Sequence, residues 1–198
     1  MKRVRVIKLG GSLLTVPSLK QKFQKWLREN PHPLTLIIVG GGPVVDAVRQ
    51  VHLANPLSDE FAHWVCIDLL QHTARIAHQV LGNVDLFETM DDLQQSFSDS
   101  NVNSTTPIIA VVQVATCFNR KYPNMGLPES WDVTSDSLAA AFSNMVAAEE
   151  LVVMKSCDVP SDGSDLESLA DFGFVDPFFP GLAEGIDHVR FVNLQTYK

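Results

Sequence analysis

Two clusters of glycine residues each follow a strand-like run of apolar residues. The run Val4–Leu9 precedes Gly10-Gly11-Ser12, and the run Leu34–Val39 precedes Gly40-Gly41-Gly42. A backbone without Cβ atoms can approach a ligand closely and direct several N–H groups at it. Where such a loop opens a helix, these groups gain the positive end of the helix dipole, which suits phosphate. Lys8 adds a positive charge beside the first cluster, so the two loops together predict a phosphate-binding site.

Two common nucleotide-binding motifs do not match these loops. Residues 40–45 lack the third glycine of the GxGxxG dinucleotide fingerprint, and Pro43 interrupts it. Neither GxxxxGKS nor GxxxxGKT occurs in the sequence. Glycine-rich strand ends are also plain turns in many α/β proteins. The interpretation therefore depends on finding two such loops, with a lysine beside one of them.

Acidic and hydroxyl side chains crowd a third segment, residues 131–137, which reads Trp-Asp-Val-Thr-Ser-Asp-Ser. The ordinary explanation is a well-capped helix start, with Thr134 as the cap and Asp136 favoured by the helix dipole. Capping explains one or two of these residues, but not five in seven. An aspartate here, Asp132 or Asp136, could hold a lysine in position or accept a hydrogen bond from a Mg²⁺-bound water.

Histidine and cysteine do not suggest a metal centre. The six histidines, at positions 32, 52, 63, 72, 78 and 188, show no metal-ligand spacing, and the three cysteines, at 66, 117 and 157, form no CxxC pair. We interpret the cysteines as reduced, mostly packed thiols of a cytoplasmic protein. No Ser-His-Asp arrangement can be argued, so we expect neither a metal held by side chains nor a nucleophilic triad.

The composition indicates one domain with a small-molecule ligand. The chain has 198 residues, of which 45% are hydrophobic, and a formal net charge of −8. This acidic balance argues against nucleic acid as the main partner, because such binding needs Lys and Arg to neutralise phosphates. No stretch of about 18 apolar residues occurs, so no membrane-spanning segment is expected. The first residues are too charged for the apolar part of a signal peptide.

Hydrophobic periodicity predicts the strands and helices that position the glycine clusters and the acidic segment. Strands are expected at residues 3–9, 34–39, 108–114, 151–154 and 189–193, and helices at 17–29, 43–53, 59–81, 90–98 and 134–148. The opening order of strand, helix, strand, helix favours a parallel sheet with helices on both faces. In the longest helix, residues at helical spacing are Phe61, Val65, Leu69, His72, Ile76 and Val80. The tail phenylalanines are interpreted as core residues: Phe172, Phe174, Phe178 and Phe179.

Taken together and in this order, the segments resemble the amino acid kinase family, which includes aspartokinase, acetylglutamate kinase, uridylate kinase and isopentenyl phosphate kinase. The matching stretches are KLGGS at 8–12, VGGG at 39–42, DVTSDSLAAAF at 132–142 and LVVMKSCDV at 151–159. The resemblance implies a three-layer αβα sandwich with a mainly parallel sheet and a shortened C-terminal part. It implies one domain over 1–198, with an acceptor and phosphate lobe at 1–118 and a reduced nucleotide lobe at 119–198.

The resemblance also implies an activity and a set of site residues. The activity is phosphoryl transfer from ATP, with Mg²⁺, to a small molecule and without a covalent enzyme intermediate. Lys8 would contact the transferred phosphoryl group, and Asp132 or Asp136 would orient the lysines or help to place Mg²⁺. N–H groups for phosphate would come from Gly10, Gly11 and Gly41, with the loops shaped by Ser12, Gly40 and Gly42. The other residues of the expected nucleotide site are Ser135, Ser137 and Asp158.

The sequence departs from the family in its second catalytic lysine. Family members usually carry that lysine in a longer C-terminal part, after a Gly-Gly-Met segment, and this sequence has no such segment. After Val159 the only Lys or Arg residues are Arg190 and Lys198. Lys155 is the best substitute, because it ends an expected strand, where α/β proteins bind ligands. The alternative is that Lys155 is an ordinary surface lysine.

The length of the chain and the residues of the third segment resemble those of the small archaeal-type kinases of this family. That group includes an aminomethylfuran phosphate kinase of methanofuran biosynthesis, which phosphorylates a phosphomonoester. We therefore expect a small-molecule kinase in the cytoplasm, with no membrane or nucleic-acid partner, that assembles as a homo-oligomer. Two alternatives stay open: a ligand-binding or regulatory protein that kept the fold and lost catalysis, and a subunit whose active site needs a partner.

Overall fold

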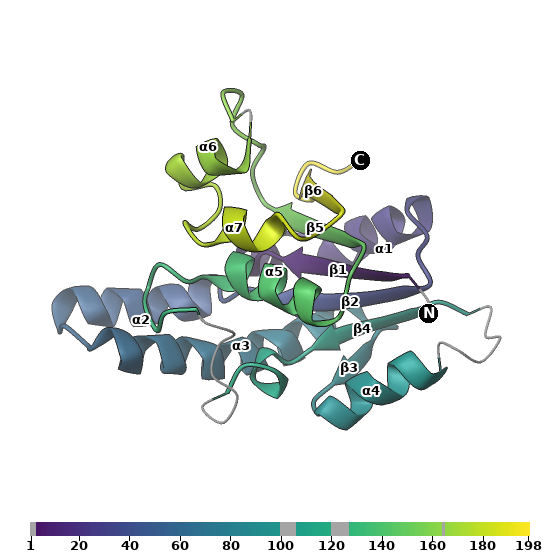
Figure 1. Cartoon of the computed structure of the whole chain (residues 1–198), viewed down its shortest axis with the longest axis horizontal. Helices are drawn as coiled ribbons and strands as arrows, with labels where there is room; N and C mark the ends of the chain where they lie inside the picture. Colours follow the sequence, from purple (N-terminus) through teal and green to yellow (C-terminus); the bar gives the residue numbers. More distant parts are fainter. Residues whose placement is uncertain (1–2, 100–105, 120–126, 164) are drawn as a thin grey trace.

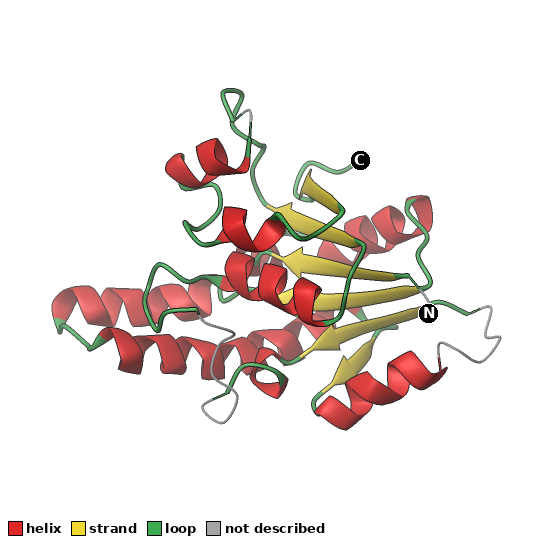
Figure 2. Cartoon of the chain, viewed as in Figure 1, coloured by secondary structure: helices red, strands yellow, loops and turns green. Residues whose placement is uncertain are grey.

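A single parallel sheet organises the computed structural model, which describes residues 3–99, 106–119, 127–163 and 165–198. Six strands are hydrogen-bonded in the order β3-β4-β2-β1-β5-β6, and every pairing is parallel (Figure 2). The strands are β1 Val4–Leu9, β2 Leu34–Val39, β3 Asp85–Phe87, β4 Ile108–Val112, β5 Glu150–Lys155 and β6 His188–Asn193. The all-parallel sheet confirms the predicted α/β fold class.

Helices cover both faces of this sheet, which makes the three layers (Figure 1). The helices are α1 Leu19–Glu29, α2 Pro43–Ala54, α3 Asp59–Leu81, α4 Met90–Asp99, α5 Ser135–Met145, α6 Leu166–Asp171 and α7 Phe179–Ala183. On one face α1 and the second half of α3 pack against Ile7, Ile37 and Val152. On the other face α4, α5, α6 and α7 share a cluster with Val6 and Leu36. In the described residues no helix is both long and apolar enough to cross a lipid bilayer.

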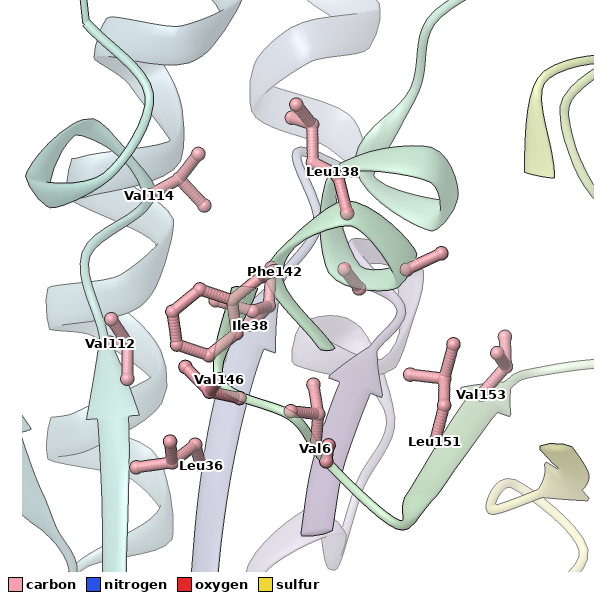
Figure 3. Packing of buried hydrophobic residues seen from close by; sticks show 14 of the residues in the cluster. Val6, Leu36, Ile38, Val112, Val114, Leu138, Phe142, Val146, Leu151 and Val153 are labelled. Carbon is pink, nitrogen blue, oxygen red and sulfur yellow. The ribbon is translucent and has the colours of Figure 1, made fainter. Parts of the chain in front are cut away.

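The central strands are continuous apolar runs because both of their faces are covered. Figure 3 shows one of these faces, where Val6 and Leu36 from neighbouring strands lie beneath Phe142 of α5. Side chains alternate between faces along a strand, so Ile7 joins the opposite cluster. These two cores fix the register of the strands, and with it the edge of the sheet at which the strands end.

The register brings the three predicted segments to one edge of the sheet. Leu9, the last residue of β1, lies opposite Val39 of β2 and Met154 of β5. The glycine clusters that follow β1 and β2 therefore leave the sheet beside Lys155, at the carboxyl ends of the strands. In open parallel sheets this edge is where ligands bind.

Several element boundaries differ from the prediction. β4 ends at Val112, two residues early, and α5 ends at Met145, where Val146 is the cap and Ala147 has a φ of 48°. The short elements β3, α6 and α7 were not predicted, because three to six residues carry too little periodicity. Phe172 is 56% exposed, so its interpretation as a core residue is wrong, whereas Phe174 and Phe179 are buried.

The apolar stripe of α3 is not the face that packs against the rest of the chain. Phe61 is 53% exposed and Ile76 is 45% exposed. The buried side of α3 consists of Ala62, His63, Trp64, Ile67, Leu70, Thr73, Ala74, Ala77 and Leu81. The helix thus has a second apolar face, which the described part of the chain covers only in part: Val65 and Leu69 are half-buried, and Phe61 and Ile76 are exposed.

Candidate active site

Two lysines converge on one buried carboxylate at the carboxyl edge of the sheet. Lys8 Nζ lies 2.8 Å from Asp136 Oδ1, and Lys155 Nζ lies 2.9 Å from Asp136 Oδ2. The three residues come from β1, the first turn of α5 and the end of β5. Lys8 is the second-last residue of β1 and Lys155 is the last residue of β5, and the start of α5 places Asp136 between them. Lys155 is therefore paired with Asp136 and is not an ordinary surface lysine.

The charges in this cluster do not cancel. Burial of Asp136 on its own would raise the pKa of its carboxyl group, but the two ammonium groups outweigh that effect and the pKa is lowered. The pKa of Lys155 is lowered by burial and by the nearby charge of Lys8, which the attraction of Asp136 only partly offsets. Two cations share one anion, which leaves one excess positive charge at the edge of the sheet. Lys155 Nζ also lies 4.9 Å from the centre of the Phe174 ring.

The two glycine loops touch each other through their backbones. A Cβ atom on Gly11 would collide with the backbone of Gly40, Gly41 and Gly42, and one on Gly42 would collide with Gly11. Gly42 also has a φ of +52°, which favours glycine. The N–H of Gly10 donates to Met154 O at 2.9 Å and that of Gly40 to Leu9 O at 2.8 Å. Gly10 is therefore held by the sheet and does not offer its N–H to a ligand, contrary to the prediction for this residue.

A cavity of about 560 Å³ opens above these residues. Its walls include nine of the predicted site residues: Lys8, Gly10, Gly11, Ser12, Gly41, Gly42, Ser135, Lys155 and Asp158. α2 and α3 form one end of the cavity with Arg49, His63 and Cys66. The loop after β5 and the end of α6 form the other end with Pro160 and Phe172. Lys8 and Lys155 thus line the same cavity as the residues of both ends.

Four predicted residues do not line the cavity. Gly40 is buried beneath the loops, and Asp136 is only 4% exposed beneath the lysines. Asp132 is exposed, and of the two candidate aspartates only Asp136 contacts the lysines. The hydroxyl of Ser137 donates to Asp176, on the side of the helix away from the cavity. The structure therefore separates Asp132 and Ser137 from the other residues of the expected site.

Asp176 is a buried residue that the sequence analysis did not find. Its Oδ2 accepts hydrogen bonds from Thr134 N at 3.0 Å, Thr134 Oγ1 at 2.7 Å and Ser137 N at 3.0 Å. Its Oδ1 accepts from Ser137 Oγ and from Phe178 N. Asp176 thus fixes the turn of α5 that carries Asp136. It lies 42 residues from Thr134 and 39 residues from Ser137 in the sequence, so no local pattern could have indicated it.

A third cation, Arg49, lies at the α2 end of the cavity. Its guanidinium group lies 5.5 Å from the centre of the Trp131 ring, and its Nη1 lies 2.9 Å from Asp46 Oδ1. His52 packs against the same indole, at 5.4 Å between ring centres. The signal that could have found Arg49 is its position as the only Lys or Arg in the helix that follows the second glycine loop. Arg49, Lys8 and Lys155 are the Lys and Arg residues of the cavity wall, as far as the structure describes it.

No group of three or more His, Cys, Asp or Glu side chains that could hold a metal ion occurs in residues 3–99, 106–119, 127–163 and 165–198. Asp136 is already paired with both lysines. Asp158 is the carboxylate of the predicted set that reaches the cavity wall, where its Oδ1 accepts from Asn193 Nδ2 at 2.8 Å. A cation at this site would therefore depend mainly on oxygen atoms of a bound ligand.

Comparison with known sequences tests the interpretation of this site. The sequence model of the amino acid kinase family matches residues 3–165. The chain belongs to this family. The match covers the two glycine loops, Asp136 and Lys155, and it ends before Phe172 and Asp176. The predicted family is thereby confirmed.

Known relatives agree with this assignment. The [5-(aminomethyl)furan-3-yl]methyl phosphate kinase of Methanocaldococcus jannaschii is 22% identical over 158 residues, which are 78% of this chain and 67% of that protein. UMP kinase from Ureaplasma parvum superposes with a TM-score of 0.66 at 12% identity, covering 100% of this chain and 92% of that one. Uridylate kinase from Archaeoglobus fulgidus gives 0.60 at 16% identity, covering 98% and 92%. The two structures show the shared fold, and the family and its kinase relatives identify this amino acid kinase as a small-molecule kinase, as predicted.

Proposed function

We propose that this kinase transfers the γ-phosphoryl group of ATP, bound with Mg²⁺, to a small phosphomonoester. The observation that carries the proposal is the pair of lysines on one buried carboxylate, beside two glycine loops and at the wall of one cavity. Phosphoryl transfer depends mainly on in-line positioning and on cations that stabilise the transferred group. Lys155 takes the place of the second catalytic lysine that the family usually carries further along the chain.

The bond changes match the charges at this site. An oxygen of the acceptor phosphate attacks the γ-phosphorus, a new P–O bond forms, the bond from the γ-phosphorus to the β–γ bridging oxygen breaks, and ADP leaves with the electron pair. Lys8 and Lys155 offset the negative charge on the transferred group, while Asp136 holds both ammonium groups in place. A phosphate monoester is largely a dianion at neutral pH, so its oxygen can attack without a general base.

Mg²⁺ would reach this site with the nucleotide. It retains several waters and binds through substrate phosphates plus one or two carboxylates. Asp158 at the cavity wall fits the second role, because Asp136 is already paired with two lysines. When bound, Mg²⁺ would offset charge on the phosphates. The end of the cavity lined by Pro160, Phe172 and Phe174 supports an aromatic base at that side.

The acceptor would occupy the end lined by α2 and α3. Arg49 and Trp131 lie there together, and they suit a phosphate group attached to a flat or apolar body. The relative from Methanocaldococcus jannaschii, by its name, acts on a furan-containing phosphate. That name supports a phosphomonoester acceptor for this chain as well. A cytoplasmic location and a homo-oligomeric assembly are further parts of the proposal.

The direct test is titration of Mg-ATP into the purified protein by calorimetry, followed by a screen of acceptors with ³¹P NMR. We expect ATP to bind and a diphosphate product to appear with phosphomonoesters but not with the matching alcohols. Transfer to alcohols or carboxylates alone would contradict the phosphomonoester acceptor. No binding at millimolar ATP by folded protein would favour the ligand-binding alternative that lost catalysis.

Arg49 gives a separate prediction about the acceptor end of the cavity. Replacing Arg49 with glutamine is expected to raise the KM for the acceptor about tenfold, with kcat changed by less than about twofold, because a charged contact is lost in both ground and transition states. Steady-state kinetics with each substrate varied in turn measures this. Arg190→Gln is the matched control, since Arg190 is exposed, pairs with Glu150 and does not line the cavity. A rise in the KM for ATP instead would place the nucleotide at this end.

A further inference from the structure

The edge strand β6 supports the loop that carries Asp158 to the cavity wall. β6 is hydrogen-bonded to β5 at one edge of the sheet, and its last residue, Asn193, lies opposite Lys155 (Figure 1). The N–H of Leu194 donates to Lys155 O at 2.9 Å. The loop with Asp158 begins directly after Lys155 and lines the cavity. The end of β6 is therefore in contact with both ends of the short stretch from Lys155 to Asp158.

The side chain of Asn193 makes three hydrogen bonds that fix the direction of its amide. Its Oδ1 accepts from Gln195 N at 3.1 Å and from Thr196 N at 3.3 Å. Its Nδ2 donates to Asp158 Oδ1 at 2.8 Å. The oxygen can only accept and the NH₂ group can only donate, so a reversed amide would lose all three bonds. The amide nitrogen of Asn193 therefore faces the carboxylate of Asp158.

The segment after Asn193 is itself attached to α1. Leu194 is fully buried in the cluster that includes residues of this helix. Lys22 Nζ donates to Tyr197 O at 2.8 Å, and the Tyr197 hydroxyl donates to the carboxylate of Glu29. Asn193 thus lies between an anchored segment and an exposed loop. Such an arrangement lowers the conformational entropy that the loop loses when a ligand binds.

A neutral amide suits a carboxylate that has to meet a cation. Asp158 is exposed, and within the described part of the chain only its Oδ1 accepts a hydrogen bond, so Oδ2 can still accept. The two lysines offset the charge of Asp136, whereas Asn193 orients Asp158 without offsetting its charge. Carboxylates that contact metal ions are usually oriented by such hydrogen bonds, and removing the partner typically costs about 10–100-fold in metal affinity or activity.

We propose that Asn193 is a positioning residue for the metal of the nucleotide, because it holds the Asp158 carboxylate toward the cavity. This inference rests on the proposed function, in which Mg²⁺ enters with ATP and meets Asp158. Asn193 lies outside residues 3–165, which the family model matches. It does not line the cavity, so it acts on the metal only through Asp158.

Calorimetry with and without the metal tests this role. Mg-ATP, and ATP with excess EDTA, are each titrated into the purified full chain. We expect Asn193→Ala to raise the Kd for Mg-ATP about tenfold and the Kd for metal-free ATP less than twofold. Tyr197→Ala is the matched control, since it loosens the same segment from α1 but leaves the bond between Asn193 and Asp158 intact. The control should bind both forms of ATP as the unaltered chain does, and circular dichroism checks that each variant is folded.

A double-mutant cycle shows whether Asn193 acts through Asp158. Asp158→Ala should raise the Kd for Mg-ATP at least as much as Asn193→Ala, and the double variant should match Asp158→Ala within about twofold. Independent effects that multiply, an unchanged Kd in Asn193→Ala, or an equal loss with and without Mg²⁺ would each overturn the inference. An unaltered chain that does not bind Mg-ATP would contradict the proposed function itself. Normal binding of Mg-ATP by the chain and by Asn193→Ala alike would overturn only the role of Asn193.

Discussion

Replacing Lys8 with alanine is expected to lower kcat/KM by about a thousandfold, equivalent to about 4 kcal/mol of transition-state stabilisation. The free energy of unfolding should fall by no more than about 2 kcal/mol. The reason for this difference is the unequal charge of the cluster. Without Lys8, Asp136 still pairs with Lys155 at 2.9 Å, so no buried charge is left alone. The transferred phosphoryl group, in contrast, loses one of its two cations.

Urea denaturation and steady-state kinetics on the same preparations separate the two effects. Lys8→Met keeps most of the side-chain volume and should show the same loss of turnover. Asp136→Asn is the contrasting variant, since it leaves two buried ammonium groups without a counter-charge, and it should lose stability as well as activity. If Lys8→Ala destabilised the protein as much as Asp136→Asn does, the role of Lys8 would be structural.

The sequence was sufficient to predict the edge of the sheet at which the site forms. The carboxyl ends of parallel strands lie at one edge of a sheet, so the predicted parallel sheet was enough to place Lys8, the glycine clusters and Lys155 at the same edge, as observed. The choice between Asp132 and Asp136 could not be made in the same way. These two residues lie four apart at the start of a helix, and only the packing of α5 decides which carboxylate meets the lysines.

The outward face of α3 shows a different limit of sequence patterns. Periodicity finds an apolar stripe but does not say what the stripe contacts. In α3 small and large residues alike pack against the chain, among them Ala77 and Leu81, whereas Phe61 and Ile76 remain exposed. The pattern therefore predicts the helix but does not identify which of its faces is packed.

Asp176 gives the second large effect that we expect. Replacing it with alanine should lower the free energy of unfolding by about 3 kcal/mol, because the change leaves several donors at a buried helix start without an acceptor. The carboxylate is only 6% exposed, and it accepts from five donors, four of them on Thr134 and Ser137. Urea denaturation measures this loss. Asp165→Ala is the matched control, since Asp165 caps α6 from an exposed position by accepting from Ser168 N, and it should lose only about 1 kcal/mol.

The effect on catalysis shows whether Asp176 also positions the site. Thr134 and Ser137 flank Asp136, so a looser turn displaces the carboxylate that holds both lysines. At a temperature where the variants are folded, we expect Asp176→Asn to lower kcat about tenfold with little change in either KM, because Asp176 does not line the cavity. Asp165→Ala should leave kcat unchanged. If Asp176→Asn lost stability but kept full kcat, Asp176 would act only as a helix cap. A loss of kcat would instead mean that the turn behind the lysines must be rigid for the two cations to meet the phosphoryl group.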